Sequence, residues 1–418
     1  MYERTVLPNG VRIISEYLPH VRSVTLGAWF TVGSRYERPE QRGLAHFIEH
    51  MLFQSTEKYS AQQIAEIMDQ SGSYFNAFTG RERTCFYFKV LDEHWPAASD
   101  VLREMLLHPL FKPREIVKER KVVLEELKMY EDDPEDQVQD LLPGKLWPAS
   151  PLGNSVLGTA ETVRGFTQAD AEAFMADHYT AKRLVIAAVG NISHGQVVDE
   201  FASAFASLPR KDAPRLDAPV LGLPGQLFYD KDTEQIHLCL GGPAFARTDE
   251  RRFALYLLDI ILGGAASSLL FQELREKRGL VYNTYSFSSL YSDAGYYGIY
   301  AGFSPDQWNQ VWDVLLDLLA NLPGKIRRDM FIRAQAQLRG SALLALESTE
   351  ARMFRQAKAE LDNSVSFGVE QFLEKIAAVQ YHELLLLAEE LFVSQASSSI
   401  ALGPGLSLKE GIRCQKIC

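Results

Sequence analysis

The order of strand-like and helix-like segments in the first half of the chain returns in the second half. Strand-like stretches at residues 11–14 and 24–32 precede longer helical patterns, and after residue 226 the same order follows stretches at 227–229 and 237–240. The halves align at an offset of 209 residues at first, which later drifts between 207 and 213, where Asn76 faces Asn283. This similarity indicates an internal duplication. Because the matched residues are common types, chance similarity between two such segments stays an alternative.

The halves are joined by a segment that is rich in proline. Between residues 208 and 225 lie Pro209, Pro214, Pro219 and Pro224 among small and charged residues, a composition that cannot continue a helix. We therefore predict an α+β fold with two similar domains, residues 1–208 and 226–418, joined by a linker at 209–225. Each domain is expected to contain a mixed, mainly antiparallel β-sheet flanked by helices. A chain of 418 residues with 46% hydrophobic residues can bury two such cores.

Charge and hydropathy exclude two classes of partner. Lys and Arg total 43 against 54 Asp and Glu, which gives a net charge of −11 without a basic stripe for phosphates. Nucleic acid is therefore not expected as a partner. No stretch offers the roughly 18 uninterrupted apolar residues of a membrane helix, and the first residues predict a turn and a strand rather than a signal peptide. A cytoplasmic protein without a membrane partner is expected.

The four cysteines are too scattered for a disulfide framework. None of them forms a Cys-x-x-Cys pair, so a reducing compartment is favoured. Cys414 and Cys418 lie near the end of the chain, where incidental thiols are expected and a metal or redox pair is the alternative.

The sequence His46-Phe47-Ile48-Glu49-His50 lies inside an apolar run, residues 44–52, that is typical of a partly buried helix. On a helix, positions i, i+3 and i+4 share a face, so both imidazoles and the Glu49 carboxylate point the same way. Two neutral histidines four residues apart form half of a zinc site, and a nearby carboxylate can act as a base toward water. Burial of all three side chains without a metal would cost a few kcal/mol. The motif therefore predicts one Zn²⁺ per chain, with Glu49 as the base.

A third zinc ligand is expected from another element, because catalytic zinc sites commonly have three protein ligands and an open position. Residues 116–130 have apolar residues at helical spacing, and Pro134 ends the pattern. Glu119 and Glu126 fall two turns apart along one edge of the apolar face, whereas Glu125 points nearly opposite. This phase favours Glu126 as the ligand and Glu119 as a residue that supports it without touching the metal. A solvated charge is expected for Glu125, and an edge salt bridge stays an alternative for Glu119.

With these residues the chain resembles the pitrilysin or insulinase family of zinc peptidases with the inverted His-x-x-Glu-His motif, and in particular its bacterial members similar to mitochondrial processing peptidase. The resemblance covers the whole chain. It places the metal ligands on His46, His50 and Glu126, the base on Glu49 and the supporting glutamate on Glu119. It also implies a substrate-binding edge strand at Asn76-Ala77-Phe78-Thr79 and catalytic contributions from Arg275 and Tyr282. The chain departs from the usual Lys-Gly-Thr after the motif helix, where it has Gln54-Ser55-Thr56, and from a usual Gly-Gly around Gly72-Ser73.

The resemblance implies a zinc endopeptidase that hydrolyses peptides or unfolded segments inside an enclosed chamber. Asn76 and Ala77 would hold the substrate as an added strand, and Tyr282 would stabilise the oxyanion. The alternative interpretation of Asn76 is that it is a turn residue. The alternative for Arg275 and Tyr282 is that they pack at the end of a helix. The family also contains noncatalytic structural and peptide-binding subunits, which is the main competing interpretation, and a metalloenzyme acting on small molecules is a third.

A homodimer is expected from the distribution of these residues. In relatives that carry four such domains in one chain, the arginine and tyrosine of the last domain face the zinc of the first across the chamber. A chain with two domains would need a second copy to rebuild this arrangement, so Arg275 and Tyr282 of the partner would complete each site.

Overall fold

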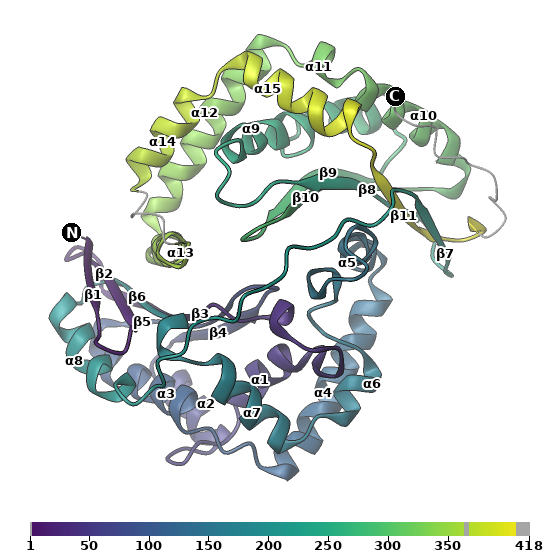
Figure 1. The fold of residues 1–418 in the computed structure, drawn as a ribbon. Helices are drawn as coiled ribbons and strands as arrows, with labels where there is room; N and C mark the ends of the chain where they lie inside the picture. Colours follow the sequence, from purple (N-terminus) through teal and green to yellow (C-terminus); the bar gives the residue numbers. More distant parts are fainter. Residues whose placement is uncertain (1, 363–367, 407–418) are drawn as a thin grey trace. The chain divides into compact units, whose positions relative to one another are not determined.

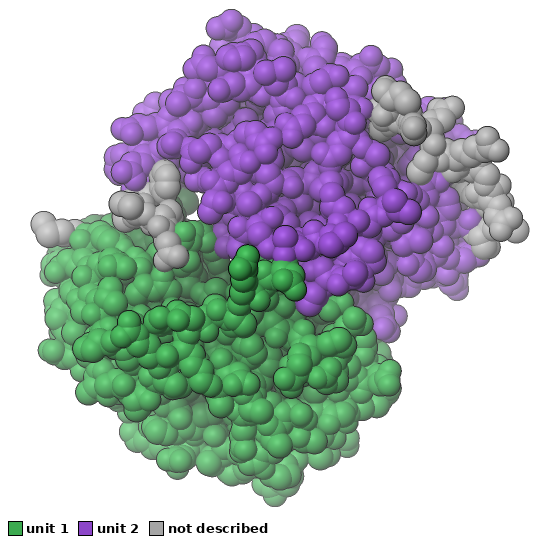
Figure 2. All heavy atoms as spheres, in the orientation of Figure 1, with its two compact units in different colours: residues 1–128, 154–217, 344–367 green, residues 129–153, 218–343, 368–418 purple. Residues whose placement is uncertain are grey.

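The computed structural model describes residues 2–362 and 368–406. The chain divides into two compact units, each formed from three separate segments (Figure 2). Unit 1 consists of residues 1–128, 154–217 and 344–367, and unit 2 of residues 129–153, 218–343 and 368–418.

Unit 1 is built on a six-stranded sheet with the order β1-β2-β6-β3-β5-β4. All neighbours are antiparallel except β2 and β6. The central strands β3 and β6 are almost continuously apolar and buried, so the sheet needs cover on both faces. The strands are β1 (Tyr2–Val6), β2 (Arg12–Tyr17), β3 (Ser23–Phe30), β4 (Tyr74–Thr79), β5 (Thr84–Leu91) and β6 (Leu184–Gly190).

Helices cover both faces of this sheet (Figure 1). One face forms the main core with α1 (Leu44–Leu52), α2 (Ala61–Gln70), α3 (Trp95–Leu107), α4 (Pro113–Asp132), α6 (Ala160–Gly165), α7 (Gln168–His178) and α8 (His194–Phe205). The other face packs against α13 (Thr349–Leu361), whose Met353 and Ala357 are fully buried against Trp29 and its neighbours.

Unit 2 repeats this design with a five-stranded sheet of order β7-β11-β8-β10-β9, in which only β7 and β11 are parallel. The strands are β7 (Gln226–Asp230), β8 (Ile236–Ala244), β9 (Asn283–Leu290), β10 (Gly295–Phe303) and β11 (Ser398–Gly403). The helices are α5 (Pro134–Leu146), α9 (Arg252–Leu262), α10 (Trp308–Ala320), α11 (Leu322–Lys325), α12 (Arg328–Leu344), α14 (Val369–Ala378) and α15 (Tyr381–Ala388). Helix α5 packs on one face with Val138 and Leu142, together with Trp147 and Leu152 that follow it, and the main core fills the other face.

Five of the six strands of unit 1 have the same order as the five strands of unit 2, and β1 has no counterpart among the described residues. The order β2-β6-β3-β5-β4 in unit 1 matches β7-β11-β8-β10-β9 in unit 2, including the single parallel pair. The predicted fold class is confirmed: two similar α+β domains, each with a mixed, mainly antiparallel sheet flanked by helices.

The chain crosses between the two compact units at several places, of which the proline-rich segment is only one. The chain passes from unit 1 to unit 2 within the predicted linker, after Asp217, but it also crosses between the units near residues 128, 153, 343 and 367. As a result, α5 precedes the linker and packs in unit 2, whereas α13 follows it and packs in unit 1. The division at 209–225 therefore separates the two halves of the sequence rather than the two units of the structure.

Among the described residues, no helix is both long and apolar enough to cross a lipid bilayer.

Candidate metal centre

Helix α1 presents both histidines from a well-anchored position in unit 1. Its apolar residues, including Phe47 and Ile48, are completely buried in the main core, which fixes the rotation of the helix about its axis. The helix starts after Gly43, whose φ of +88° and close approach to the carbonyl oxygen of Leu157 leave no room for a side chain.

The first turn of α1 is capped by the buried carboxylate of Glu37. Its Oε2 accepts a hydrogen bond from the backbone N–H of Gly43 (2.8 Å) and its Oε1 one from Ala45 (2.7 Å). Burial raises the pKa of Glu37 to about 8, although these backbone hydrogen bonds act in the opposite direction. Glu37 thus fixes the backbone immediately before His46.

Helices α1 and α4 bring three metal-ligating groups together. One ligand atom each from His46, His50 and Glu126 lies within 4.8 Å of the others. Nε2 of His50 lies 3.3 Å from Glu126 Oε2, and Nε2 of His46 lies 3.7 Å from Glu126 Oε1. Ligand atoms at about 2.0–2.1 Å from a tetrahedral zinc ion are roughly 3.3–3.4 Å apart. The spacing and the donor set, two imidazole nitrogens and a carboxylate oxygen, therefore fit zinc.

The glutamates of α4 lie where the helical phase places them. The Glu126 side chain reaches the histidines and is 41% exposed, whereas Glu125 is 69% exposed and pairs with Lys128 at 2.7 Å on the surface. Glu119 is buried, and its Oε1 accepts a hydrogen bond from Nδ1 of His50 (2.9 Å). Glu119 thus orients the imidazole from behind, with Nε2 toward Glu126, as supporting carboxylates do in zinc sites.

The pKa values of the two histidines shift in opposite directions. Burial alone would lower the pKa of His50, but hydrogen bonds to Glu119 and Glu126 outweigh it and raise the pKa to about 9. Burial, with the neighbouring His50, lowers the pKa of His46 to about 4. The hydrogen bond from His50 lowers the pKa of Glu126. These opposite shifts favour a proton on His50, between two carboxylates, and a neutral imidazole on His46 when no metal is bound.

Glu49 is held by a hydroxyl group from strand β4. Thr79 Oγ1 donates a hydrogen bond to Glu49 Oε2 at 2.5 Å. Burial raises the pKa of Glu49, and the Thr79 hydrogen bond partly opposes this shift. A carboxylate with a raised pKa on the same helical face as two metal ligands suits a group that takes up and returns a proton.

Strand β4 carries Asn76 and Ala77 at the edge of the sheet. It is the last strand in the order and pairs with β5, so among the described residues its outer edge faces no further strand. The Asn76 side chain bridges Tyr74 OH (2.8 Å) and the backbone N–H of Ala77 (2.9 Å). An unpaired edge of this kind can accept an extended peptide as an additional strand.

Arg275 and Tyr282 lie close together in unit 2. Arg275 lies in the last turn of the short helix η6 (Phe271–Glu276). Its guanidinium carbon lies 4.9 Å from the ring centre of Phe271 and 5.9 Å from that of Tyr282. Tyr282 precedes β9 and is 74% exposed, so its hydroxyl is accessible. Their predicted contribution to catalysis stays a prediction.

The matching helix of unit 2 lacks the metal ligands. At the positions that face His46, Glu49 and His50, α9 has Leu255, Leu258 and Asp259. Both leucines are buried in the core, and Ser286 donates hydrogen bonds to the side chain and to the backbone carbonyl of Asp259. Within the described residues, the His46, His50 and Glu126 cluster therefore has no equivalent in unit 2.

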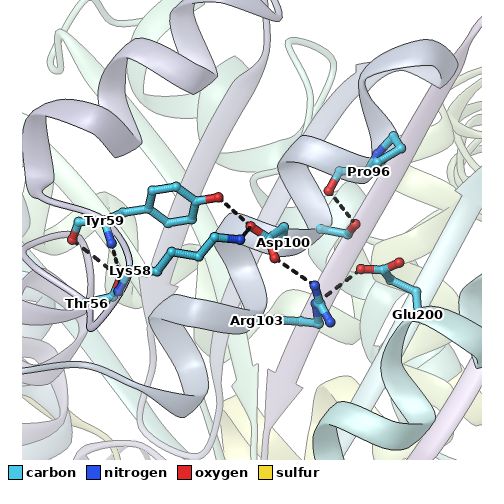
Figure 3. Close-up of polar contacts among 8 residues, drawn as sticks. Thr56, Lys58, Tyr59, Pro96, Asp100, Arg103 and Glu200 are labelled. Carbon is cyan, nitrogen blue, oxygen red and sulfur yellow. Dashed lines mark hydrogen bonds and ion pairs between the residues drawn. The ribbon is translucent and has the colours of Figure 1, made fainter.

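The loop after α1 is anchored to helices on the same side of the sheet (Figure 3). Tyr59 OH and Lys58 Nζ both reach Asp100 Oδ2 of α3, at 2.5 and 2.6 Å. Asp100 Oδ1 also pairs with Arg103, which in turn lies 3.1 Å from Glu200 of α8. Lys58 and Tyr59 thus anchor the loop that contains Gln54 and Ser55 to α3.

Sequence reasoning did not predict that Glu37, Gln54 and Thr79 contact the site, although Thr79 was expected as part of the substrate-binding edge strand. An acidic residue shortly before a predicted helix is a signal for Glu37, because carboxylates favour helix N-termini. Thr79 and Gln54 contact residues that are distant in sequence, and only the packing of β4 and α4 on α1 reveals them.

The ligand cluster on this two-unit α+β fold defines a candidate metal-binding protein, and comparison with known proteins identifies the family. Residues 12–160 match the family described as Insulinase (Peptidase family M16), and residues 165–338 match the Peptidase M16 inactive domain. The chain belongs to the M16, or insulinase, family. It is 42% identical to an uncharacterized zinc protease of Streptomyces coelicolor, over 96% of this chain and 89% of that protein. It is 41% identical to the uncharacterized zinc protease YmxG of Bacillus subtilis, over 94% and 96%.

Two solved structures share the fold. A protease from Helicobacter pylori superimposes with a TM-score of 0.88 at 22% identity, covering 97% of this chain and 99% of the other. A protein from Pseudomonas fluorescens described as a peptidase M16 inactive domain gives a TM-score of 0.88 at 20% identity, covering 97% and 98%. At these identities the likeness concerns the fold alone, which is the two-domain fold of M16 peptidases.

Proposed function

We propose that this chain is a zinc-dependent endopeptidase that hydrolyses peptides or unfolded segments. The observation that carries the proposal is the convergence of His46, His50 and Glu126 within 4.8 Å beside the carboxylate of Glu49. Relatives named zinc proteases support it over nearly the full chain. A bound zinc ion would supply a Lewis acid that polarises the peptide carbonyl group and acidifies water.

Different residues of the chain would have different roles in the hydrolysis of the peptide bond. Glu49 would take a proton from water and pass it to the leaving amine, which suits a carboxylate with a raised pKa. Asn76 and Ala77 would bind the substrate backbone along the edge of β4, with little dependence on the substrate side chains. Arg275 and the exposed hydroxyl of Tyr282 would contact the substrate and the developing oxyanion.

We further propose that the active form is a homodimer in a reducing, cytoplasmic compartment, with sites enclosed in a chamber. The family resemblance supports this assembly, since the proposed catalytic residues are distributed between the two units. Cys414 and Cys418, for which incidental thiols or a metal or redox pair were considered, lie outside the described residues.

Metal analysis combined with a peptide-cleavage assay tests the proposed activity. Purified protein should contain about one zinc per chain and cleave peptides in an unstructured library, with products identified by mass spectrometry. Glu49→Gln should keep the zinc and lose activity by about 10²- to 10⁴-fold, because the base is removed while the ligands remain. Zinc without cleavage of any peptide would favour a noncatalytic subunit. Cleavage by Glu49→Gln at the normal rate would refute the role of Glu49.

A further inference from the structure

The loop after α1 is tied to α4 by two adjacent side chains. Gln54 Nε2 donates a hydrogen bond to Glu119 Oε2 at 2.9 Å. The hydroxyl group of the next residue, Ser55, donates to Glu115 Oε1. These glutamates are four residues apart and therefore lie on one face of α4. The two positions at which the loop departs from the usual family sequence thus both contact the helix that carries Glu126.

The Gln54 hydrogen bond ends on the carboxylate that orients a metal ligand. Glu119 uses one oxygen, Oε1, for Nδ1 of His50 and the other, Oε2, for Gln54, with both distances at 2.9 Å. Glu119 is buried, so water does not readily replace either partner. With both oxygens engaged, the carboxylate cannot rotate about its terminal bond without losing a hydrogen bond. Its orientation determines where Nε2 of His50 points.

We propose that Gln54 is a positioning residue of the metal centre, which acts through Glu119 to aim His50 at the zinc ion. The inference rests on the proposed zinc site and adds a third member to the chain of contacts Gln54, Glu119 and His50. The contacts predict that loss of the amide weakens zinc binding even though Gln54 does not touch the metal.

Zinc affinity measured by competition with a chelator tests this inference. Gln54→Met keeps the length of the side chain and removes the donor, and zinc should bind about 10-fold more weakly, at the low end of the 10- to 100-fold range for residues that support metal ligands. Gln54→Lys restores an N–H donor and should recover most of the affinity. Gln62→Met is a matched control, since Gln62 donates a similar hydrogen bond to Glu66 (2.7 Å) on the exposed face of α2. Its zinc affinity should equal that of the wild type.

Two further measurements separate positioning from a general effect on folding. The zinc-free Gln54→Met protein should melt at a slightly lower temperature than zinc-free wild type, because a buried oxygen of Glu119 loses its partner. A purely structural role would lower the melting temperature in the same way but leave zinc affinity unchanged. In a Glu119→Gln background, Gln54→Met should have little additional effect, because the intermediary is already altered. Wild-type zinc affinity in Gln54→Met, or an undiminished effect in the double variant, would overturn the inference while the zinc site stands. Failure of the wild-type protein to bind zinc would overturn both the inference and the proposed function.

Discussion

At the scale of single residues, the candidate base is tied to the strand proposed to bind substrate. Thr79 is the last residue of β4, and its hydroxyl group holds Glu49 at 2.5 Å. A peptide added to β4 would therefore be placed on the same element that orients the base. Neither residue alone provides this link, since it depends on the packing of β4 beside α1.

Substitution of Thr79 tests this link directly. Thr79→Val preserves the shape of the side chain and removes the hydroxyl group, so Glu49 loses its fixed orientation. We expect kcat to fall by about 10- to 100-fold, because small errors in the position of a reacting group are costly. Zinc content should be unchanged, and Thr79→Ser should restore most of the rate. Steady-state kinetics on one cleaved peptide would check this, and equal kcat values for Thr79→Val and wild type would contradict it.

The neighbouring glutamates of α4 give a second test at this scale. Glu126→Gln removes a carboxylate that lies within 3.3 Å of His50 and should weaken zinc binding by at least about 10-fold. Glu125→Gln removes an exposed charge that is paired with Lys128 and should leave zinc binding nearly unchanged. Chelator competition on both variants provides the comparison. The reverse order of effects would show that Glu125 and not Glu126 is the ligand.

The pKa of His50 predicts how zinc binding depends on pH. Its value in the metal-free fold, about 9, lies above the ordinary 6.5, so its stabilising interactions are complete below about 6.5 and are lost as the pH rises through 9. Zinc requires the neutral imidazole and must displace this proton. Affinity should rise about tenfold per pH unit up to about 9, with about one proton released from His50 per zinc at pH 7. Calorimetry in buffers of different ionisation enthalpy measures this release, and its absence at pH 7 would contradict the shift.

At the scale of elements, each half of the sequence contributes one helix to the unit that is built mainly from the other half. Helix α13 packs on the sheet of unit 1 and α5 on that of unit 2, each against the face opposite the main core. These helices supply the second cover that apolar central strands require. Trp29 Nε1 donates to Met353 Sδ at 3.2 Å, and the hydroxyl groups of Thr25 and Thr349 lie 2.8 Å apart, so α13 is fixed by specific contacts as well as by burial.

A buried methionine of α13 tests how much this helix stabilises unit 1. Met353→Ala should lower the free energy of unfolding by about 2–5 kcal/mol, because it leaves a cavity beside Trp29. Met129→Ala is the control, since Met129 is 74% exposed and its truncation should change stability by no more than about 0.5 kcal/mol. Chemical denaturation of the zinc-free proteins gives both values. Similar stability of the two variants would indicate that α13 is only loosely attached.

Much of the fold was accessible from sequence because its signals are local. The alternation of strands and helices, the duplication and the helix that contains His46 and His50 all follow from periodicity and spacing over short stretches. The phase of α4 likewise separates Glu126 from Glu125. The positions of α5 and α13 could not be predicted from the sequence. An amphipathic pattern indicates that a helix has an apolar face, but it does not indicate which sheet that face covers. For the same reason, the contacts of Thr79, Glu37 and Gln54 emerged only from the structure.

At the scale of the whole molecule, two similar units carry different parts of the proposed chemistry. Unit 1 holds the metal-ligand cluster and Glu49, whereas unit 2 holds Arg275 and Tyr282 and has leucines in place of the first histidine and the glutamate of the motif. The match to the M16 inactive domain covers residues 165–217 of unit 1 and 218–338 of unit 2, so it includes Arg275 and Tyr282 and none of the proposed metal ligands. The second unit thus retains the scaffold without the equivalent metal ligands among its described residues.

The proposed homodimer with shared sites can be tested by complementation between two inactive proteins. One carries Glu49→Gln and keeps Arg275 and Tyr282, and the other carries Arg275→Ala and Tyr282→Phe and keeps Glu49. If each site combines the zinc and base of one subunit with the arginine and tyrosine of its partner, every mixed dimer contains one complete site. After free exchange at equal concentrations, half of the dimers are mixed and half of their sites are complete, so activity should reach about a quarter of the wild-type value. Sedimentation should show a dimer, and differently labelled subunits should confirm exchange. If exchange occurs and the mixture stays as inactive as its components, the sites are not shared between subunits, and Arg275 and Tyr282 act within their own chain or take no part in catalysis.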